Sequence, residues 1–256
     1  MNPLGLAAMS VPAAVLMLIR CPRLSGAAEL AAEPSASSDV SKGPASAPAD
    51  KREAVAALLR LGARLEVDES DGVQSVAAVK MKIADADLVH LAALSELESL
   101  EIAGGQVTDA GLAHLGGLVE LRRLYLRDLP ITDAGLEHLR GLTRLEVLTL
   151  SNTKVSGKGL AYLRGMKNLG VLNLTGSPIV DASLTYLKRL PSLNTLGLQD
   201  TKVTGAGLAH LQSVSELRVL NLNHCKIADS SLAYLEGLSE LRMLYVKGAG
   251  VTKVGE

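Results

Sequence analysis

The amino-acid sequence predicts an α/β solenoid, with a curved parallel sheet on its concave side and short helices on its convex side. Two observations predict this fold class. Leucines superimpose every 24 residues from Leu97 onward, and fixed self-similarity of this length is typical of a chain coiled from stacked repeats. The core must also be aliphatic, because 48% of the 256 residues are hydrophobic while the chain has five Tyr, no Phe and no Trp. Identical layers filled by identical medium-sized side chains explain this composition.

The charge balance argues against nucleic acid as a partner. The chain has 26 Lys and Arg against 27 Asp and Glu, which gives a formal net charge of −1. Proteins that bind nucleic acid usually carry a basic surplus, together with aromatic or arginine platforms on which bases stack. The composition supplies neither.

Residues 1–28 form an apolar leader. Residues 4–19 are uncharged and mostly apolar, although a membrane span needs about 20 such residues. Small residues at 25–28 suit signal-peptide cleavage, whereas Arg20 and Arg23 follow the apolar run and no Lys or Arg precedes it. Three interpretations stay open: a cleaved signal for export to the cell envelope or beyond, an anchor that tethers the protein to a membrane, or a mis-chosen start codon of a cytoplasmic protein.

Residues 29–72 precede the repeats in two parts. Residues 29–50 are rich in Ala, Ser and Pro without apolar periodicity, so we expect a disordered linker. Residues 51–62 have helical spacing, with Val55, Leu58, Leu59 and Leu61 expected on the apolar side. Residues 64–67 can pair with 73–79 across a turn. We therefore expect 51–72 to be an N-terminal cap, a helix with a hairpin, that covers the edge strand.

Residues 73–256 are the repeats, and the last one is incomplete. Each repeat begins with LxxLxL, in which alternate leucines such as Leu148 and Leu150 face the core while Thr149 faces the other way, as a strand requires. A Thr or Ser follows as the expected helix cap, with Asp181 and Asp229 as the candidates where it is missing. One turn position is polar in four of seven repeats and should hydrogen-bond the turn backbone; its residues are Gly105, Leu129, Thr153, Ser177, Thr201, Cys225 and Ala249.

The LxxLxL strand followed by a turn and helix such as TDAGL at 108–112 resembles the leucine-rich repeat family. The 24-residue TDAGL-type repeats of bacterial proteins, which are related to the repeats of F-box adaptors, are the most similar kind. The resemblance covers residues 73–256. It implies a scaffold without catalytic activity that binds a protein or polysaccharide on its concave face. Two alternatives stay open: an intracellular adaptor or substrate-recognition subunit of a larger assembly, and a cryptic hydrolase.

The residues that could carry metal or nucleophilic chemistry favour structural roles. His90, His114, His138 and His210 share one repeat position, so they lie on successive helices and are too far apart to converge within about 2.1 Å of one metal ion. Cys21 and Cys225 form neither a close pair nor a disulfide framework. His224 and Cys225 are neighbours at a strand end and should point in opposite directions. We therefore expect no catalytic site, metal or cofactor.

The phase of the repeat also predicts which strand residues face a partner. Arg123, Tyr125 and Arg127 project from one strand and combine an aromatic ring with two guanidinium groups, the residue types that dominate interface hot spots. The four strands that follow carry no charge on this face. The expected binding residues are Arg123, Tyr125, Arg127, Thr149, Asn173, Asn221 and Tyr245.

Overall fold

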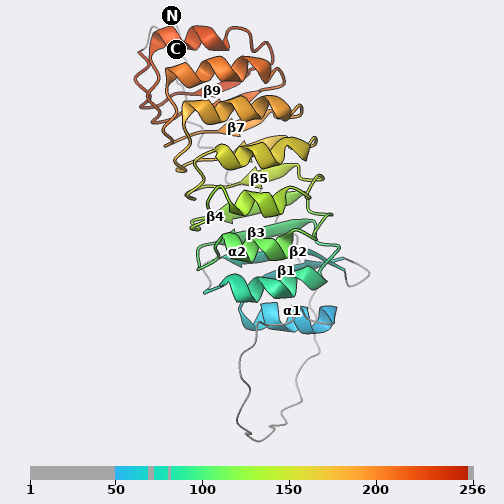
Figure 1. Cartoon of the computed structure of the whole chain (residues 1–256). Helices are drawn as coiled ribbons and strands as arrows, with labels where there is room; N and C mark the ends of the chain where they lie inside the picture. Colours follow the sequence, from blue (N-terminus) through green and yellow to red (C-terminus); the bar gives the residue numbers. More distant parts are fainter. Residues whose placement is uncertain (1–49, 69–71, 80–81, 253–256) are drawn as a thin grey trace, which may run out of the picture. The chain divides into compact units, whose positions relative to one another are not determined.

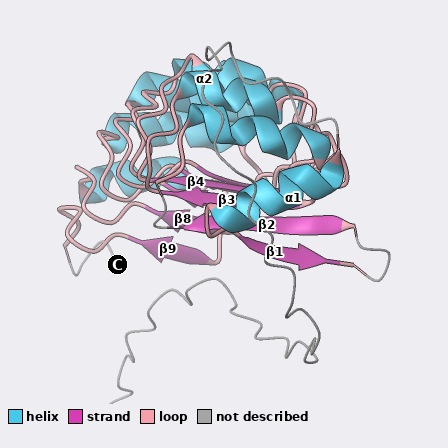
Figure 2. Ribbon diagram, turned by 90° about the horizontal axis from the view of Figure 1, so that it is seen from below, coloured by secondary structure: helices cyan, strands magenta, loops and turns pink. Residues whose placement is uncertain are grey.

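The structure is a computed structural model that describes residues 50–68, 72–79 and 82–252. The leader and nearly all of the predicted linker lie outside these residues, as do Cys21, Met81 and the last four residues. The predicted solenoid is present: one sheet lies on one side and short helices lie on the other (Figures 1 and 2).

The sheet has nine strands in sequence order, so each strand pairs with its neighbour in the chain. Strands β2 to β9 are parallel with a shift of 24 residues, which places Leu100, Leu124 and Leu148 side by side; β1 is antiparallel to β2. The repeat phase predicted from the leucines is therefore confirmed. The strands are β1 (Arg64–Val67), β2 (Val73–Val79), β3 (Ser99–Ala103), β4 (Arg123–Arg127), β5 (Val147–Thr149), β6 (Val171–Asn173), β7 (Thr195–Gly197), β8 (Val219–Asn221) and β9 (Met243–Tyr245).

Most of the helices are 3₁₀ helices, a type that the sequence pattern did not specify. Residues three apart eclipse one another in a 3₁₀ helix. Leu184, Leu187 and Leu190 have this spacing and are all buried. The helices are α1 (Lys51–Arg60), η1 (Asp85–Ala93), α2 (Asp109–Leu112), η2 (Ala113–Leu115), η3 (Gly135–Leu139), η4 (Lys158–Gly165), η5 (Asp181–Arg189), η6 (Gly205–Ser213) and η7 (Asp229–Leu235).

The polar turn position makes the backbone hydrogen bonds that its composition predicted. All four polar side chains donate to a backbone carbonyl oxygen directly after a strand, and they do so in pairs that share one acceptor. The bonds are Thr153 Oγ1 to Leu150 O (3.0 Å), Ser177 Oγ to Leu150 O (2.7 Å), Thr201 Oγ1 to Leu198 O (2.7 Å) and Cys225 Sγ to Leu198 O (3.0 Å).

Carboxylates connect most repeats to the next one. In four of these connections a Thr N–H donates to the Asp of the preceding repeat at 2.7 or 2.8 Å, and the Thr hydroxyl donates to the other carboxylate oxygen. Ser156 takes the place of Thr in the fifth. We call these aspartate junctions: Asp85 to Thr108, Asp109 to Thr132, Asp133 to Ser156, Asp181 to Thr204 and Asp229 to Thr252.

The expectation that Asp181 and Asp229 cap their own helices is wrong, because both carboxylates bind the following repeat instead. Ser156 also makes no cap bond: its hydroxyl donates to Asp133. Thr108 and Thr204 do cap their helices, since each hydroxyl accepts from an N–H two residues later at 3.3 Å. Thr132 accepts the same kind of bond from Ala134 at 3.2 Å but does not cap η3, which begins later with Ala134 as its N-cap and has no side-chain cap bond.

Two junctions replace the aspartate by glycine. Gly157 is followed 26 residues later by Ser183, and Gly205 by Ser231. In each pair a Cβ on the glycine would overlap the serine hydroxyl. In four aspartate junctions the residue 26 positions after the Asp is itself a glycine, which leaves room for the carboxylate. Each of these six junctions thus has one bulky partner and one glycine, and we call the second kind glycine junctions.

The segment 50–79 forms the predicted helix and strand pair. Ala54 and Leu58, one helical turn apart, are buried, whereas Leu59 is 54% exposed. The expectation that Leu59 lies on the apolar side is wrong, because it sits about 100° around the helix from Leu58 and the buried stripe is narrow. β1 pairs with β2 as expected, with an irregularity at Glu66 and Val67.

Candidate functional site

Figure 2 shows that the helices lie on one side of the sheet and leave the other side uncovered. The strand residues between the buried core leucines face that uncovered side. We call this the open sheet face; it is the concave face of the sequence prediction. Strand pairing brings residues 24 apart into contiguous rows. One row contains Arg123, Val147, Val171 and Thr195, and the next contains Glu101, Tyr125, Thr149 and Asn173.

Three of the predicted residues form a cluster on β4. Arg127 makes an ion pair with Glu101 of β3, and its guanidinium carbon lies 5.7 Å from the centre of the Tyr125 ring. Arg127 is therefore held between a carboxylate and an aromatic face, although its Nε atom is buried without a hydrogen-bond partner. Arg123 is exposed and makes no ion pair within the described residues. We call Glu101, Arg123, Tyr125 and Arg127 the arginine–tyrosine cluster.

Thr149 is next to this cluster but is only 7% exposed. Its strand neighbours are Tyr125 on one side and Asn173 on the other, and both side chains are larger than its own. A short side chain between two longer ones is covered by them. Thr149 is therefore part of the floor of the open sheet face.

The remaining predicted residues lie farther along the sheet. The Oδ1 atoms of Asn173 and Asn221 each accept a hydrogen bond from the backbone N–H two residues later, at 3.0 Å. Asn221 Nδ2 also donates to Gln199 at 3.3 Å. Tyr245 is on β9, five strand spacings from Tyr125, or roughly 24 Å at about 4.8 Å per strand. The structure therefore brings Arg123, Tyr125 and Arg127 together but not Tyr245.

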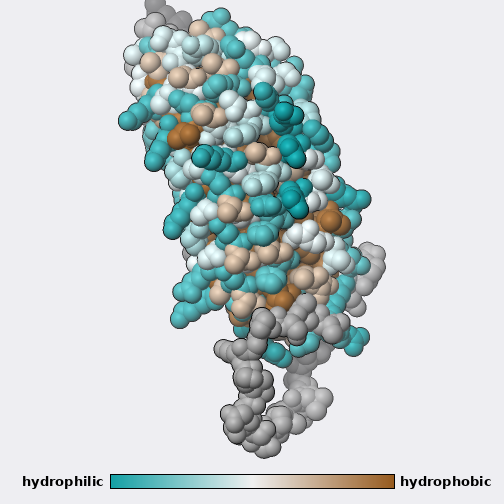
Figure 3. All heavy atoms as spheres, in the orientation of Figure 1, coloured by the Kyte–Doolittle hydropathy of each residue, from teal (hydrophilic) through white to brown (hydrophobic). Residues whose placement is uncertain are grey.

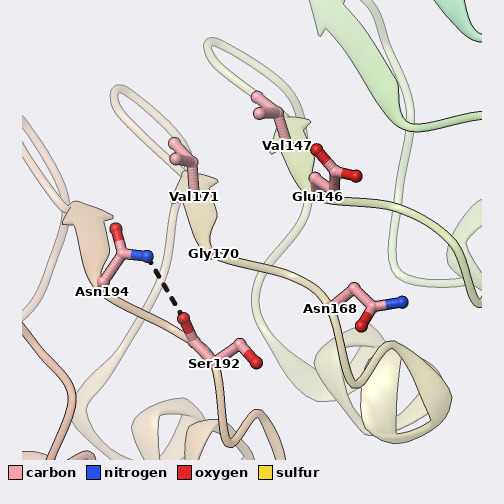
Figure 4. Close-up of a pocket in the computed structure, with 7 residues that line it drawn as sticks. All are labelled: Glu146, Val147, Asn168, Gly170, Val171, Ser192 and Asn194. Carbon is pink, nitrogen blue, oxygen red and sulfur yellow. Dashed lines mark hydrogen bonds between the residues drawn. The ribbon is translucent and has the colours of Figure 1, made fainter.

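A hollow of about 460 Å³ opens where β5, β6 and β7 begin (Figure 4). Its lining is uncharged except for one carboxylate and consists of Glu146, Val147, Asn168, Gly170, Val171, Ser192 and Asn194. The Asn194 side chain lies across the hollow's edge and donates to the Ser192 carbonyl oxygen at 3.3 Å. Because Val147 is the strand neighbour of Arg123, the hollow adjoins the arginine–tyrosine cluster. We call it the Gly170 hollow.

Sequence reasoning missed the Gly170 hollow, although a signal was present. The position before each strand is occupied by Glu98, Arg122, Glu146, Gly170, Asn194, Arg218 and Arg242. Arg122 makes an ion pair with Glu146 at 2.7 Å, and Arg218 lies 3.9 Å from Glu240. Gly170 interrupts this row of long polar side chains, and the space that a side chain would occupy is the hollow.

His224 and Cys225 point in opposite directions, as the repeat phase predicted. His224 is exposed with Nδ1 2.8 Å from Asp200, while Cys225 is buried and donates to a backbone carbonyl. His90 and His114 are half-buried, and His138 and His210 are exposed, each on a different helix. Nowhere in residues 50–252, outside the two gaps, do three His, Cys, Asp or Glu side chains gather so as to hold a metal ion. Each helix in the same part of the chain is too short or too polar to span a bilayer.

Comparisons with known proteins agree with this architecture. Residues 216–235 match the family described as leucine-rich repeat. Internalin C2 from Listeria monocytogenes is 24% identical, with 76% of this chain and 92% of that chain covered and a TM-score of 0.55. A chain of the PEPR1–AtPEP1 structure is 20% identical, with 73% of this chain and 26% of that chain covered and a TM-score of 0.54.

A third solved structure is the ectodomain of the plant membrane receptor kinase GASSHO1/SCHENGEN3 from Arabidopsis thaliana, in complex with CASPARIAN STRIP INTEGRITY FACTOR 2. It is 18% identical, with 73% of this chain and 23% of that chain covered and a TM-score of 0.54. No curated protein matches the chain in sequence. The sheet register and the similarity to these solved structures show that the chain has the leucine-rich repeat fold, and residues 216–235 match that family.

Proposed function

We propose that this protein is a non-catalytic scaffold that binds an extended segment of a protein partner across β4 to β7. The observation that carries the proposal is the fixed geometry of the arginine–tyrosine cluster. Arg127 is engaged by Glu101 and Tyr125, so the ring and one guanidinium are ordered before a partner arrives. Ordering side chains in advance lowers the entropy lost on binding.

Arg123 supplies the free charge of the site. It is exposed on the same strand and unpaired within the described residues. Its guanidinium can therefore donate two hydrogen bonds to a partner's carboxylate in a bidentate ion pair. Beyond it the open sheet face is uncharged as far as β8, and Val147 and Val171 form an apolar wall of the Gly170 hollow. The expected segment therefore has an acidic residue near Arg123 and a small uncharged side chain in the hollow.

The aromatic residues favour a protein over a polysaccharide. Sugar rings are commonly held between or upon aromatic faces, and the open sheet face has two rings, Tyr125 and Tyr245, on strands β4 and β9. The two rings are too far apart to form one stacking platform for a sugar. Two of the structurally similar proteins are described as complexes, PEPR1–AtPEP1 and GASSHO1/SCHENGEN3 with its factor, which supports protein binding by analogy of fold.

We also propose that the apolar leader exports the protein to the cell envelope or beyond. The description of one similar structure as an ectodomain is compatible with this location. Cell fractionation with sequencing of the mature N-terminus tests it. An intact N-terminus in the cytoplasm would instead favour the intracellular adaptor.

Capture of partners by the immobilised full-length protein tests the binding site. Proteins captured from envelope and cytosol extracts are identified, and the affinity of each purified partner is then measured. We expect the Arg123→Ala/Tyr125→Ala protein to lose at least about 2 kcal/mol of binding free energy without a change in melting temperature, as for a hot spot. His138→Ala, on the exposed helix side, is the control that should bind normally. Equal affinity of the double variant and wild type would exclude this site.

Gly170→Glu provides an independent test of the hollow. A Cβ at this position would lie 2.9 Å from Asn194 Nδ2, the end of a side chain that can move, so the fold should tolerate it. The new side chain would fill the hollow and complete the row of long polar side chains at the position before each strand. We expect weaker partner binding with a melting temperature near that of wild type; unchanged affinity would remove the hollow from the site.

A further inference from the structure

Positive charge is concentrated in the middle repeats. Residues 147–199 contain one acidic residue, Asp181, whose carboxylate is occupied by Thr204. The same stretch contains six basic residues: Lys154, Lys158, Arg164, Lys167, Lys188 and Arg189. The whole chain has a net charge of −1, so these repeats differ strongly from the rest of the molecule. A local surplus of this kind attracts anions.

Two of these basic residues line a small pocket on the helix side. It has a volume of about 160 Å³, lies between η4 and η5, and is lined by Leu160, Ala161, Arg164, Tyr186 and Arg189. Both arginines are exposed, and neither makes an ion pair within the described part of the chain. The pocket is far smaller than the roughly 300 Å³ or more of sites for drug-sized ligands, so it suits a single chemical group.

Comparison with the preceding repeat shows how the pocket arises. Arg140 occupies the repeat position of Arg164, and Glu137 neutralises it at 3.6 Å. In the next repeat Ala161 stands where Glu137 stood, so the acidic partner is missing. Arg189 in turn takes the position that Gly165 has one repeat earlier. Relative to the preceding repeat, the surroundings of Arg164 therefore lack one acidic side chain and have one additional basic side chain.

We propose that the pocket of Arg164, Tyr186 and Arg189 binds a phosphate monoester. A dianionic phosphate balances two guanidinium groups and accepts several hydrogen bonds from each, whereas a carboxylate would leave part of their mutual repulsion uncompensated. Tyr186 lines the same pocket and carries a hydroxyl that can donate a neutral hydrogen bond, and the apolar lining by Leu160 and Ala161 strengthens the electrostatic attraction. Lys167, whose Nζ lies 3.5 Å from the Arg189 carbonyl oxygen, extends the positive field at the rim.

The phosphate can belong to a soluble molecule or to the headgroup of a lipid. Figure 3 shows the helix side, on which hydrophilic and neutral residues predominate and hydrophobic residues are scattered. This surface suits recognition of a charged group from either source. The site is separate from the open sheet face, so the proposal does not depend on the proposed protein partner.

Titration of the full-length protein with phenyl phosphate and with inorganic phosphate, at constant ionic strength, tests the proposal. Acetate is the carboxylate control. A parallel assay sediments the protein with phosphatidylcholine vesicles that contain or lack phosphatidic acid. We expect saturable phosphate binding in at least one assay, and at least about tenfold weaker binding of acetate, equivalent to about 1.4 kcal/mol.

The variants decide whether the pocket is responsible. Arg164→Gln/Arg189→Gln should weaken phosphate binding at least about tenfold while its thermal melt stays that of wild type, because both side chains are exposed. Arg140→Gln is the matched control from the same repeat position and should bind normally. The Tyr125→Ala protein should also bind phosphate normally. No saturable binding in either assay, equal binding of acetate, or equal losses in Arg140→Gln and the double variant would overturn the proposal.

Discussion

The Oδ1 atom of Asp133 accepts a hydrogen bond from the backbone N–H of Gly159 at 2.9 Å, although the two residues are 26 positions apart. The same oxygen accepts from the Gly157 N–H at 3.0 Å, and Ser156 donates its hydroxyl to the other oxygen. One carboxylate therefore satisfies several donors at the start of the next helix, where backbone N–H groups have no partner within the helix. Such a junction therefore adds a specific polar contact to the leucine core in fixing how two repeats stack.

Gly159→Ala should destabilise the fold by about 1–3 kcal/mol, the usual effect of overpacking. A Cβ at this position would lie 2.7 Å from the backbone oxygen of Asp133, which cannot move without shifting the previous repeat. Urea unfolding monitored by circular dichroism measures the change. Gly117→Ala is the control, because no atom lies within 4 Å of the added carbon. Equal stability of both variants would show that the junction is looser than the structure indicates.

Asp133→Asn should lower stability near neutral pH and have a smaller effect in acid. Burial raises the pKa of the Asp133 carboxyl, but hydrogen bonds from Ser156, Gly159 and Gly157 together outweigh it and hold the pKa below its ordinary value of 3.8. A lowered pKa in the folded state means that the ionised carboxylate stabilises the fold above the unfolded value, and that this stabilisation is lost as the pH falls through the folded value. The difference between the unfolding free energies of the two proteins should therefore be largest at about pH 6 and should shrink as the pH falls below the ordinary value of 3.8. A constant difference would contradict the expectation.

Six of the junctions pair a bulky residue in one repeat with a glycine in the next or the preceding one. Conversion of a glycine junction into an aspartate junction tests directly whether these two residues must match. Gly205→Asp alone should be destabilising, because its side chain would collide with Ser231. Ala228→Thr and Ser231→Gly together supply the donor and the space that the other junctions have. The triple variant should recover most of the stability lost in the single variant, as expected for coupled residues. Additive losses across the three substitutions would exclude the coupling.

Removal of residues 51–72 tests the predicted cap. Leu58 and Ala54 are buried against the first repeat, and β1 pairs along the outer edge of β2. Without them the protein should expose core leucines and an unpaired strand edge, which promotes association through that edge. Sedimentation should then show aggregates. A folded monomer that begins at Val73 would contradict the assignment.

The 24-residue spacing of the leucines predicted those features of the structure that depend on the period and phase of the repeat. The register of Leu100 with Leu124 follows from a 24-residue shift, and the hydrogen bonds of Thr153 and Ser177 follow from a polar residue at an inward turn position. These features need only the direction of a side chain relative to the strand. The same spacing placed Arg123, Tyr125 and Arg127 on one strand.

Features that depend on side-chain length and rotamer were not predictable in this way. Thr149 has the right direction but is covered by longer neighbours, and Arg127 is paired with Glu101 rather than free. The aspartates were misjudged because a carboxylate at the start of a helix can serve its own turn or the next repeat. Asp181 serves the next repeat, where Thr204 offers two donors.

The junctions also limit how the length of this protein can change. Deletion of residues 157–180 would place Ser183 where Gly159 meets the Asp133 carboxylate, so a single excised repeat leaves a mismatch. Deletion of 157–204 would instead place Gly207 there and keep Gly205 with Ser231. Thr153 would also gain Cys225 as its turn partner, the arrangement that Thr201 now has. In this stretch the interchangeable module is therefore 48 residues, two turns of the coil, and shuffled or shortened descendants should differ by that increment.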